Sequence, residues 1–309
     1  MWKDIDYLIK SHYFQRDYIS EEELYHNGEV KKMQNDVIFN GVAYELYYDI
    51  CEKLSSIAYG CLECIPKKYP LFLPKSVIER TQYFKKFPHH CIFCCDVGND
   101  FMIFKDKSLH NNFEISEYQD NYMKLSDYVM SPSACYHVYE EYKNSELEDE
   151  MSISFIHNVC RNESFGNHGC ELGRLRSYNV REFVFLGSEE YVKGKLKQTE
   201  TLIYDMLCDF GLAFCINRAT DSFIMPEEET IKAMQLISDV KHEFRVGISD
   251  EKSLAIGSVN YHAESFSYPF SISMKNINRL VTGCVGVGIE RLAIAYMMQH
   301  REYLFSKRN

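Results

Sequence analysis

Two apolar segments joined by a glycine-rich loop constrain the fold of this chain most strongly. Residues 153–161 and 178–186 are rich in β-branched and aromatic side chains, and Gly166, Gly169 and Gly173 lie between them. This pattern predicts a long β-hairpin. A hairpin pairs neighbouring strands antiparallel. Because other segments have helical spacing, we expect an α+β protein.

The remaining segments divide into predicted helices and predicted strands. Apolar residues recur with helical spacing in residues 44–57, in residues 189–212 and after Gly288. Extended segments are predicted at residues 127–139, 242–248, 254–262 and 270–274. The chain shows no internal repeat and no linker, so residues 1–309 are predicted to form one domain. Within it, residues 189–240 are predicted to be a helical insertion.

The composition narrows the class of protein and of partner. Hydrophobic residues make up 46% of the 309 residues and charged residues 26%, as in a soluble globular protein. Charges in the first residues rule out a signal peptide, and the apolar stretches are too short for a membrane span. We therefore expect a cytoplasmic protein. The net charge of −11 makes a tRNA partner unlikely, because nucleic acids bind Lys/Arg-rich surfaces.

Twelve cysteines are expected to be mostly thiols in a cytoplasmic protein. Two Cys-x-x-Cys pairs occur, Cys61 with Cys64 and Cys91 with Cys94. The four sulfurs would bind a structural zinc only if they converged tetrahedrally. The second pair lies in an apolar segment, which favours packing of the thiols as small hydrophobic groups.

Charged residues and glycines in two distant segments point to a nucleotide site. Arg161 and Glu163 stand two residues apart at the end of the first hairpin segment, and Phe183 lies on the second. Near the C-terminus, the segment Gly283-Cys284-Val285-Gly286-Val287-Gly288 runs into a helix that carries Arg291. Each pattern alone also suits an ordinary strand pair or turn. The two in this order and separation favour a nucleotide site, in which arginines stay charged and present a planar fork to phosphate.

These segments resemble motifs 2 and 3 of class II aminoacyl-tRNA synthetases. The resemblance implies an antiparallel sheet of about six strands flanked by helices. It also implies that Arg161 and Arg291 are catalytic residues that bind ATP, which is held with Mg²⁺. Arg161 would contact the α-phosphate and the substrate carboxylate, and Arg291 would cover one face of adenine and reach the γ-phosphate. Glu163 would bind the adenine amino group, and Phe183 would stack on the base.

Three further segments resemble the seryl branch of class II, so that the likeness covers roughly residues 40–300. They are residues 73–87, residues 128–135, which look like a substrate-recognition strand, and residues 254–262, which look like the penultimate active-site strand. Ser258 and Asn260 on the last are candidate substrate-binding residues. Residues 254–257 lack the acidic residue that seryl synthetases use for Mg²⁺, which leaves Glu243 or a water-mediated arrangement. The tRNA-binding arm of seryl synthetases has no counterpart in the sequence.

One substitution within this resemblance points to a metal. Cys135 stands where ordinary seryl synthetases place a Glu against the substrate amine, and a neutral thiol cannot replace that charge. If the sheet is as implied, Glu182 and Cys284 point into the same cavity. Two thiolates and one carboxylate are good ligands for Zn²⁺ and leave one position open for the amine of a small amino acid. From their spacing alone, the thiols would be buried core cysteines.

The Cys…Glu…Cys arrangement resembles the atypical seryl-tRNA synthetases of methanogens and the amino acid:[carrier protein] ligases. The ligases are truncated seryl-synthetase homologues that activate a small amino acid and transfer it to the phosphopantetheine thiol of a carrier protein. We therefore expect such a ligase, with glycine, alanine or serine as substrate. The alternatives are tRNA aminoacylation and a non-catalytic regulatory paralogue that binds a nucleotide or an amino acid.

The resemblance also implies partners. A homodimer is expected through the motif 1 region, at about residues 43–74. Residues 189–240 are a candidate docking element for the carrier, because Lys193 and Lys197 could meet an acidic carrier helix. The same lysines also suit an ordinary solvated helix face.

Overall fold

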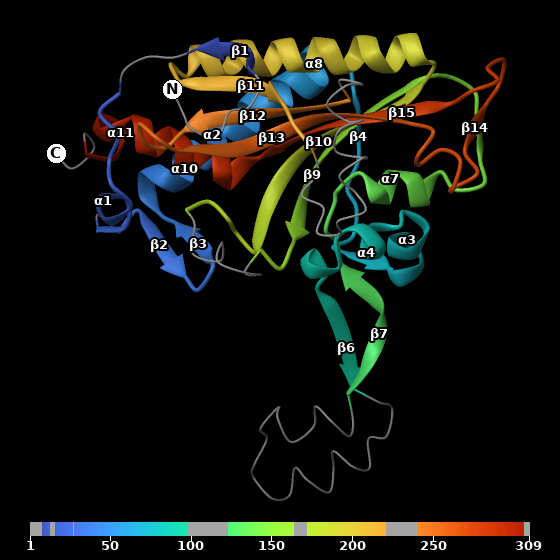
Figure 1. Cartoon of the computed structure of the whole chain (residues 1–309), viewed down its shortest axis with the longest axis horizontal. Helices are drawn as coiled ribbons and strands as arrows, with labels where there is room; N and C mark the ends of the chain where they lie inside the picture. Colours follow the sequence, from blue (N-terminus) through green and yellow to red (C-terminus); the bar gives the residue numbers. More distant parts are fainter. Residues whose placement is uncertain are drawn as a thin grey trace, which may run out of the picture.

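The structure is a computed structural model that describes residues 8–12, 16–26, 28–97, 123–163, 172–220 and 240–305. An eight-stranded sheet crosses the molecule (Figure 1). Its strands in spatial order are β1 (Leu8–His12), β11 (Phe214–Arg218), β12 (Lys241–Gly247), β13 (Ser253–Ala263), β15 (Val281–Gly288), β10 (Ser177–Gly187), β9 (Met151–Cys160) and β4 (Ile65–Pro66).

The six strands from β11 to β9 are antiparallel throughout, as predicted. Two edge strands extend this set: β1 pairs antiparallel with β11, and β4 pairs parallel with β9. The predicted hairpin is β9 and β10, which pair in continuous register from Cys160 and Ser177 to Met151 and Leu186. Because β10 also pairs with β15 along its length, the two sequence motifs lie side by side in the centre of the sheet.

Three helices cover one face of the sheet, which we call the back face. They are α2 (Gly41–Ser55), α8 (Glu189–Asp209) and α10 (Ile289–Gln299). Glycine lets α8 approach β15 closely, since a Cβ on Gly283 would lie 2.8 Å from Leu196 Cδ1. The Ser188 side chain caps α8 by accepting a hydrogen bond from the Tyr191 N–H. Beyond Ser55, α2 continues as a π-helix, η1 (Ser56–Cys61).

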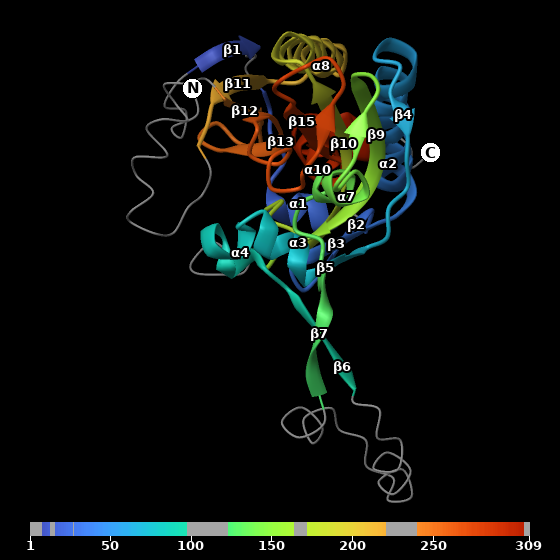
Figure 2. The ribbon, with the colours of Figure 1, turned by 90° about the vertical axis from the view of Figure 1, so that its right-hand side faces the viewer.

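Smaller elements lie at the opposite, front face (Figure 1). They are α3 (Lys75–Arg80), α4 (Tyr83–Lys86), the 3₁₀ turn η2 (Pro88–His90), α7 (Tyr136–Glu141) and a small sheet of β5 (Phe72–Pro74), β7 (Met123–Met130) and β6 (Phe93–Val97). Figure 2 shows that β6 and β7 project away from the rest of the molecule. The other described elements are α1 (Glu21–His26), β2 (Val30–Met33), β3 (Asp36–Phe39), β8 (Glu146–Leu147), β14 (Ser273–Met274) and α11 (Arg301–Phe305).

Three of the predicted boundaries are wrong. Residues 127–139 are not one extended segment, because β7 ends at Met130 and α7 begins at Tyr136. Residues 189–240 are not one helical insertion: α8 ends at Asp209, and β11 belongs to the main sheet. Residues 221–239 of that segment lie outside the described residues. Only Ser273–Met274 of the predicted strand 270–274 forms a strand.

No helix in the part of the chain that the structure describes is both long enough and apolar enough to cross a bilayer.

Candidate active site

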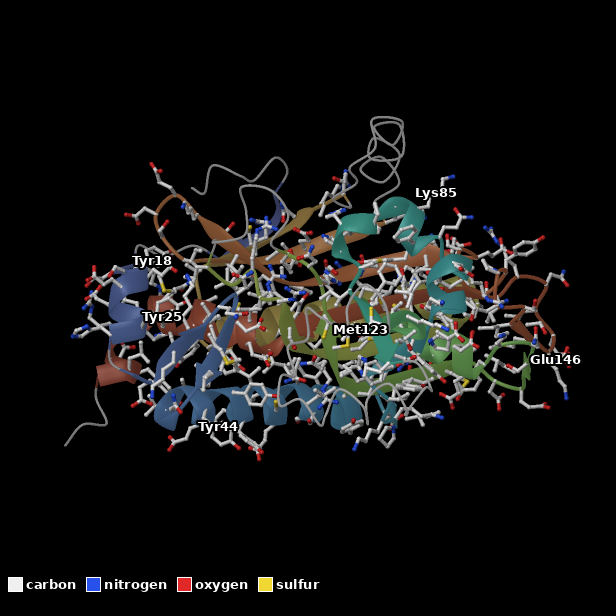
Figure 3. All side chains as sticks on the ribbon, turned by 90° about the horizontal axis from the view of Figure 1, so that it is seen from below. Tyr18, Tyr25, Tyr44, Lys85, Met123 and Glu146 are labelled. Carbon is white, nitrogen blue, oxygen red and sulfur yellow. The ribbon has the colours of Figure 1, made fainter. Side chains whose placement is uncertain are left out.

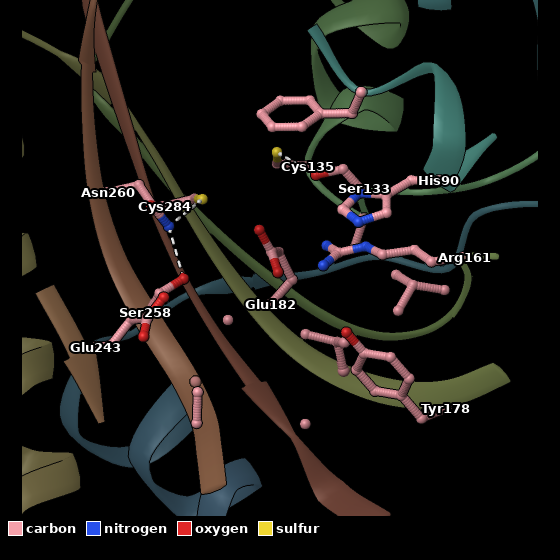
Figure 4. A pocket seen from close by; sticks show the side chains of 18 of the residues that line it. His90, Ser133, Cys135, Arg161, Tyr178, Glu182, Glu243, Ser258, Asn260 and Cys284 are labelled. Carbon is pink, nitrogen blue, oxygen red and sulfur yellow. Dashed lines mark hydrogen bonds between the residues drawn. The ribbon is translucent and has the colours of Figure 1, made fainter. Parts of the chain in front are cut away.

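A cavity of about 830 Å³ opens on the front face of the sheet. Its floor is formed by β10, β15, β13 and β12, and its walls by residues 133–136, the end of β9 and the η2 turn. Figure 4 shows Glu182 near the middle, Cys135 and Cys284 at one end, and Arg161 and Tyr178 together on one side. The residues that the sequence singled out on separate strands therefore meet in one place, with the exception of Phe183.

Side chains on β10 alternate between the cavity and the back face. Tyr178, Val180 and Glu182 line the cavity. Phe183 is fully buried and does not line the cavity, because successive strand residues point to opposite faces. The prediction that Phe183 stacks on adenine is therefore wrong. The aromatic ring of β10 that faces the cavity is Tyr178.

Charged groups gather around Tyr178. The guanidinium of Arg291 lies over the Tyr178 ring, 5.5 Å from its centroid. Glu163 is close to three arginines: Arg174 Nη1 lies 3.5 Å from its carboxylate, and Arg161 and Arg291 act through their charge. Burial opposes ionisation of Glu163, but these cations outweigh it and lower the pKa of the carboxyl. Glu163 is thus held as a carboxylate, which accepts hydrogen bonds from an N–H donor such as an amino group.

The two arginines are fixed differently. Arg161 Nε donates a hydrogen bond to the carbonyl oxygen of Pro132 at 2.8 Å, which orients its guanidinium. Arg291 Nε is buried and has no hydrogen-bond partner within the described residues. A buried N–H without a partner is costly, so an acceptor from a bound ligand would stabilise this arrangement.

The three predicted metal ligands converge. One ligand atom each of Cys135, Glu182 and Cys284 lies within 4.8 Å of the others, and all three residues are buried. Cys135 directly precedes α7, Glu182 lies on β10, and Cys284 lies on β15 opposite Val184 of β10. Glycine makes room for the carboxylate, because a Cβ on Gly286 would lie 2.8 Å from Glu182 Oε2.

Polar neighbours surround the two sulfurs. The Ser133 hydroxyl lies 3.3 Å from Cys135 Sγ. Asn260 Nδ2 lies 3.7 Å and His262 Nε2 3.6 Å from Cys284 Sγ, while the other ring nitrogen of His262 lies 3.2 Å from the buried Tyr139 hydroxyl. Such outer contacts fix the orientation of metal ligands in proteins.

Without a cation this cluster retains protons. Burial raises the pKa of the Glu182 carboxyl well above its usual range, and Cys135 adds to the effect. The hydrogen bond between the two sulfurs raises the pKa of Cys284 and lowers that of Cys135, so one proton stays on Cys284. A divalent cation would replace these protons, and two sulfurs with one carboxylate are a donor set that suits Zn²⁺. The residues present therefore fit a zinc ion.

The other predicted residues on β13 also reach the cavity. Ser258 and Asn260 line it, and Asn260 Nδ2 donates a hydrogen bond to Ser258 Oγ at 3.0 Å. Glu243 on β12 lines it as well, opposite Ser258 in the sheet register. Among the described residues, the cysteine pairs form no cluster of three or more metal-binding side chains; Cys61 is exposed and Cys64 is buried.

The sequence reasoning missed Tyr178, Arg174 and His262. The period of a strand was the available signal for Tyr178, since it lies an even number of residues from Glu182 and therefore on the same face. Arg174 and His262 gave no comparable signal, because their positions depend on the loop before β10 and on the pairing of β13 with β15.

Comparison with known proteins first supports the fold. No family profile matches the chain. Its fold matches the seryl-tRNA synthetase of M. kandleri in a crystal structure with A. aeolicus tRNASec, with a TM-score of 0.83 and 18% identity over 96% of this chain and 60% of that one. The predicted class II synthetase fold is thereby confirmed.

Particular relatives follow from sequence similarity. Two amino acid–[acyl-carrier-protein] ligases of Bradyrhizobium diazoefficiens are 25% and 26% identical over 90% and 82% of this chain, and over 83% and 76% of their own lengths. The type-2 serine–tRNA ligase of Methanocaldococcus jannaschii is 24% identical over 78% of this chain, which spans about half of that protein (47%). The chain is therefore similar in sequence both to these ligases and to the type-2 serine–tRNA ligases.

Proposed function

We propose that the protein uses ATP to activate a small amino acid, glycine, alanine or serine, as an aminoacyl-adenylate, and transfers it to the phosphopantetheine thiol of a carrier protein. One observation carries this proposal: the Cys135, Glu182 and Cys284 cluster opens into the same cavity as Arg161, Glu163 and Arg291. The first set can hold the amine end of an amino acid and the second an adenosine phosphate.

In the first step, an oxygen of the substrate carboxylate attacks the α-phosphorus of ATP, and pyrophosphate leaves with the electrons of the broken P–O bond. Arg161 neutralises the charge that develops on the α-phosphate. Glu163 accepts a hydrogen bond from the adenine amino group, and the base stacks on the Arg291 guanidinium, which itself lies over the Tyr178 ring. Positioning and charge neutralisation account for most of the acceleration in such a reaction.

Cys135, Glu182 and Cys284 would hold Zn²⁺. When bound, the ion supplies a Lewis-acid position for the free amine of the substrate, which selects for α-amino acids. Ser133, Asn260 and His262 orient the two sulfurs through their contacts. Tyr139 is fully buried, and the ring of Phe266 stacks on it. Phe266 also contacts the His262 ring edge to face, and these contacts keep His262 in place.

In the second step, the carrier thiol attacks the carbonyl carbon of the adenylate, and AMP leaves. No cavity side chain is assigned as the base for this thiol. The phosphate of the leaving AMP therefore takes the proton of the thiol. The carrier is proposed because the two ligases, which share similarity along most of both chains, are named for an acyl carrier protein. The acidic net charge of −11 also suits a protein partner better than a nucleic acid.

The docking element for the carrier stays a proposal. Helix α8 packs on the back face of the sheet, whereas the cavity opens on the front face. Lys193 and Lys197 on α8 pair with Glu189 at 2.6 Å and Glu200 at 2.8 Å. A carrier docked there would need to pass its arm around the edge of the sheet.

The decisive experiment is amino-acid-dependent exchange of labelled pyrophosphate into ATP, followed by mass analysis of a phosphopantetheinylated carrier. We expect exchange with glycine, alanine or serine, and loss of exchange in Arg161→Gln. Exchange with no amino acid would refute the proposal, and normal exchange without any carrier product would refute its second step.

Two alternatives predict different results. Similarity to the type-2 serine–tRNA ligases supports tRNA aminoacylation as the second candidate, which predicts serine-dependent labelling of tRNA. A regulatory paralogue would bind ATP or an amino acid without exchange. The presence of both Arg161 and Arg291 in the cavity favours catalysis.

A further inference from the structure

The first residues of β10 have a neighbouring strand on only one side. Residues 177–179 pair with β9, whereas the ladder between β10 and β15 begins only at Val180 and Gly288. Successive N–H groups of a strand point to alternate sides, so those of Ser177 and Asn179 face the side on which β15 has ended. A partly buried N–H without an acceptor is unfavourable. These two groups therefore need acceptors from elsewhere in the chain.

Two carboxylates from distant parts of the chain supply these acceptors. Asp36, the first residue of β3, accepts a hydrogen bond from the Ser177 N–H at 2.9 Å. Glu290, in the first turn of α10, accepts one from the Asn179 N–H at 2.8 Å. The side chain of Asn179 donates a second hydrogen bond to Glu290, from Nδ2 to Oε1 at 2.9 Å. Tyr178 lies between the two contacts, so the backbone is held on both sides of it.

The residue between these contacts lies beneath Arg291. Tyr178 points into the cavity (Figure 4), whereas its neighbours on the strand point to the back face. Arg291 follows Glu290 in α10, and its guanidinium lies 5.5 Å from the centroid of the Tyr178 ring. Gly288 permits this approach, because a Cβ there would lie 3.2 Å from Arg291 Cδ and 3.3 Å from Tyr178 Cε2. Glu290 and Asn179 thus join the two segments that carry Arg291 and the ring beneath it.

The carboxyl group of Glu290 changes its charge near neutral pH. Burial raises its pKa to about 7, the charge of Asp36 adds to the rise, and the hydrogen bonds from Asn179 oppose it. The carboxylate accepts both hydrogen bonds from Asn179, whereas the protonated group has one oxygen that donates instead. The contact is therefore stronger above pH 7 than below it. The titratable groups around Glu290 are Tyr47 and Cys51 of α2, Asp36 of β3 and, acting on Cys51, Arg181 of β10.

We infer that Glu290 is a positioning residue for the nucleotide, which holds the Tyr178 ring beneath Arg291 through Asn179, with Asp36 in a supporting role. This inference rests on the proposed adenylation, in which adenine stacks on Arg291. Without Glu290, the Asn179 N–H loses its acceptor, and the starts of β10 and α10 are no longer joined. The guanidinium and the ring beneath it can then shift apart. Small displacements of this kind weaken binding, because a bound group depends on side chains that are fixed from behind.

The test measures binding of AMP to the full chain by calorimetry, in wild type, Glu290→Ala, Asp36→Ala and Glu200→Ala. Glu200 of α8 is the matched control, a buried carboxylate on the same back face that contacts His242 Nδ1 at 2.7 Å and Lys197 Nζ at 2.8 Å. We expect Glu290→Ala to weaken AMP binding about 10-fold or more. Asp36→Ala should weaken it by less, because water can replace an acceptor at this half-buried position. Glu200→Ala should bind AMP as wild type does.

Glu290→Gln adds a readout that a purely structural role would not change. This variant keeps the shape of the side chain and one acceptor oxygen, but it does not titrate. At about pH 6 it should bind AMP as wild type does and recover most of the affinity lost in Glu290→Ala. From about pH 6 to pH 8, the affinity of wild type relative to Glu290→Gln should rise about 3-fold or more, because only wild type gains a carboxylate. The ratio cancels the titration of the AMP phosphate, which is common to both proteins.

Several outcomes overturn the inference. They are wild-type AMP binding in Glu290→Ala, equal weakening in Glu290→Ala and Glu200→Ala, and no AMP binding by wild type. A ratio between wild type and Glu290→Gln that stays constant with pH also overturns it, and this comparison is decisive even if Glu290→Ala does not fold. Binding of AMP does not require amino-acid activation. A wild type that binds AMP but shows no pyrophosphate exchange would therefore refute the proposed function alone.

Discussion

At the scale of single residues, the metal-binding side chains were predictable from the sequence. The alternation of side chains along β10 was not used to decide which residues face the cavity. Cys135, Glu182 and Cys284 were predicted as one cluster, and their ligand atoms do converge. Glu182 and Phe183 are neighbours on β10, so they cannot both face the cavity. The resemblance suggested Phe183 as the adenine platform, whereas the strand period alone would have selected Tyr178.

Gly286 tests the residue-scale account of the metal cluster. We expect Gly286→Ala to lower zinc affinity about 10-fold or more, because the new methyl group would meet the Glu182 carboxylate at 2.8 Å and move it. Zinc affinity is measured by competition with a chelating dye. Gly194→Ala on α8 is the control, since a Cβ there meets nothing within 4 Å. Unaltered zinc affinity in Gly286→Ala would show that Glu182 is not a ligand.

At the scale of elements, short helices limited what the sequence could show. The segment 127–139 looks extended because tyrosine and valine favour strands. Its last part is α7, whose six residues are too short to display a helical period. Packing decides the outcome: α7 lies on β9 through His137 and His157, whose Nε2 atoms are 3.1 Å apart, with Tyr69 stacked on His137. This contact places Cys135 at the start of the helix.

The histidine pair predicts a pH dependence of stability. Burial lowers the pKa of His157 from 6.5 to about 4, so the folded state keeps the neutral ring while the unfolded chain binds a proton. The stabilisation is complete above pH 6.5 and is lost as the pH falls towards 4, by up to about 3 kcal/mol. We expect His157→Gln to flatten this part of the curve.

Urea unfolding of chelator-treated protein at several pH values measures the effect, because chelation removes any contribution of metal loss. A slope between pH 6.5 and 4 that is equal in wild type and His157→Gln would contradict the assignment.

At the scale of the whole molecule, the sheet and its central motifs were predicted, and its edges were not. Four of the six central strands, β9, β10, β12 and β13, lie in segments that were predicted to be extended, whereas the six-stranded sheet itself was implied by the resemblance. Strand β4 has only two residues and joins β9 in parallel from far away in the sequence, which no local pattern reveals. Strand β11 lies in the segment that was interpreted as a helical insertion.

The outer surface of α2 supports the proposed homodimer. Tyr44, Tyr48 and Tyr59 are 50%, 52% and 40% exposed on α2 and η1, within the predicted interface of residues 43–74. Ile65 and Phe72 are also exposed there. Figure 3 shows Tyr44 at the rim of the molecule. Large exposed apolar groups that gather on one surface are typical of contact sites.

We expect the double variant Tyr44→Glu and Tyr48→Glu to shift the protein from dimer to monomer in size-exclusion chromatography with light scattering, because burial of two carboxylates in an interface is unfavourable. Tyr268→Glu, at a position that is 83% exposed outside this region, is the control and should remain dimeric. A monomeric wild type would refute the dimer, and a dimeric double variant would place the interface elsewhere.

The zinc content of the purified protein, measured by elemental mass spectrometry, tests the central claim most directly. The proposal predicts about one zinc per chain in wild type and in Cys61→Ala, and almost none in Cys135→Ala or Cys284→Ala. Zinc content that is equal in all four proteins, or absent from wild type, would contradict it.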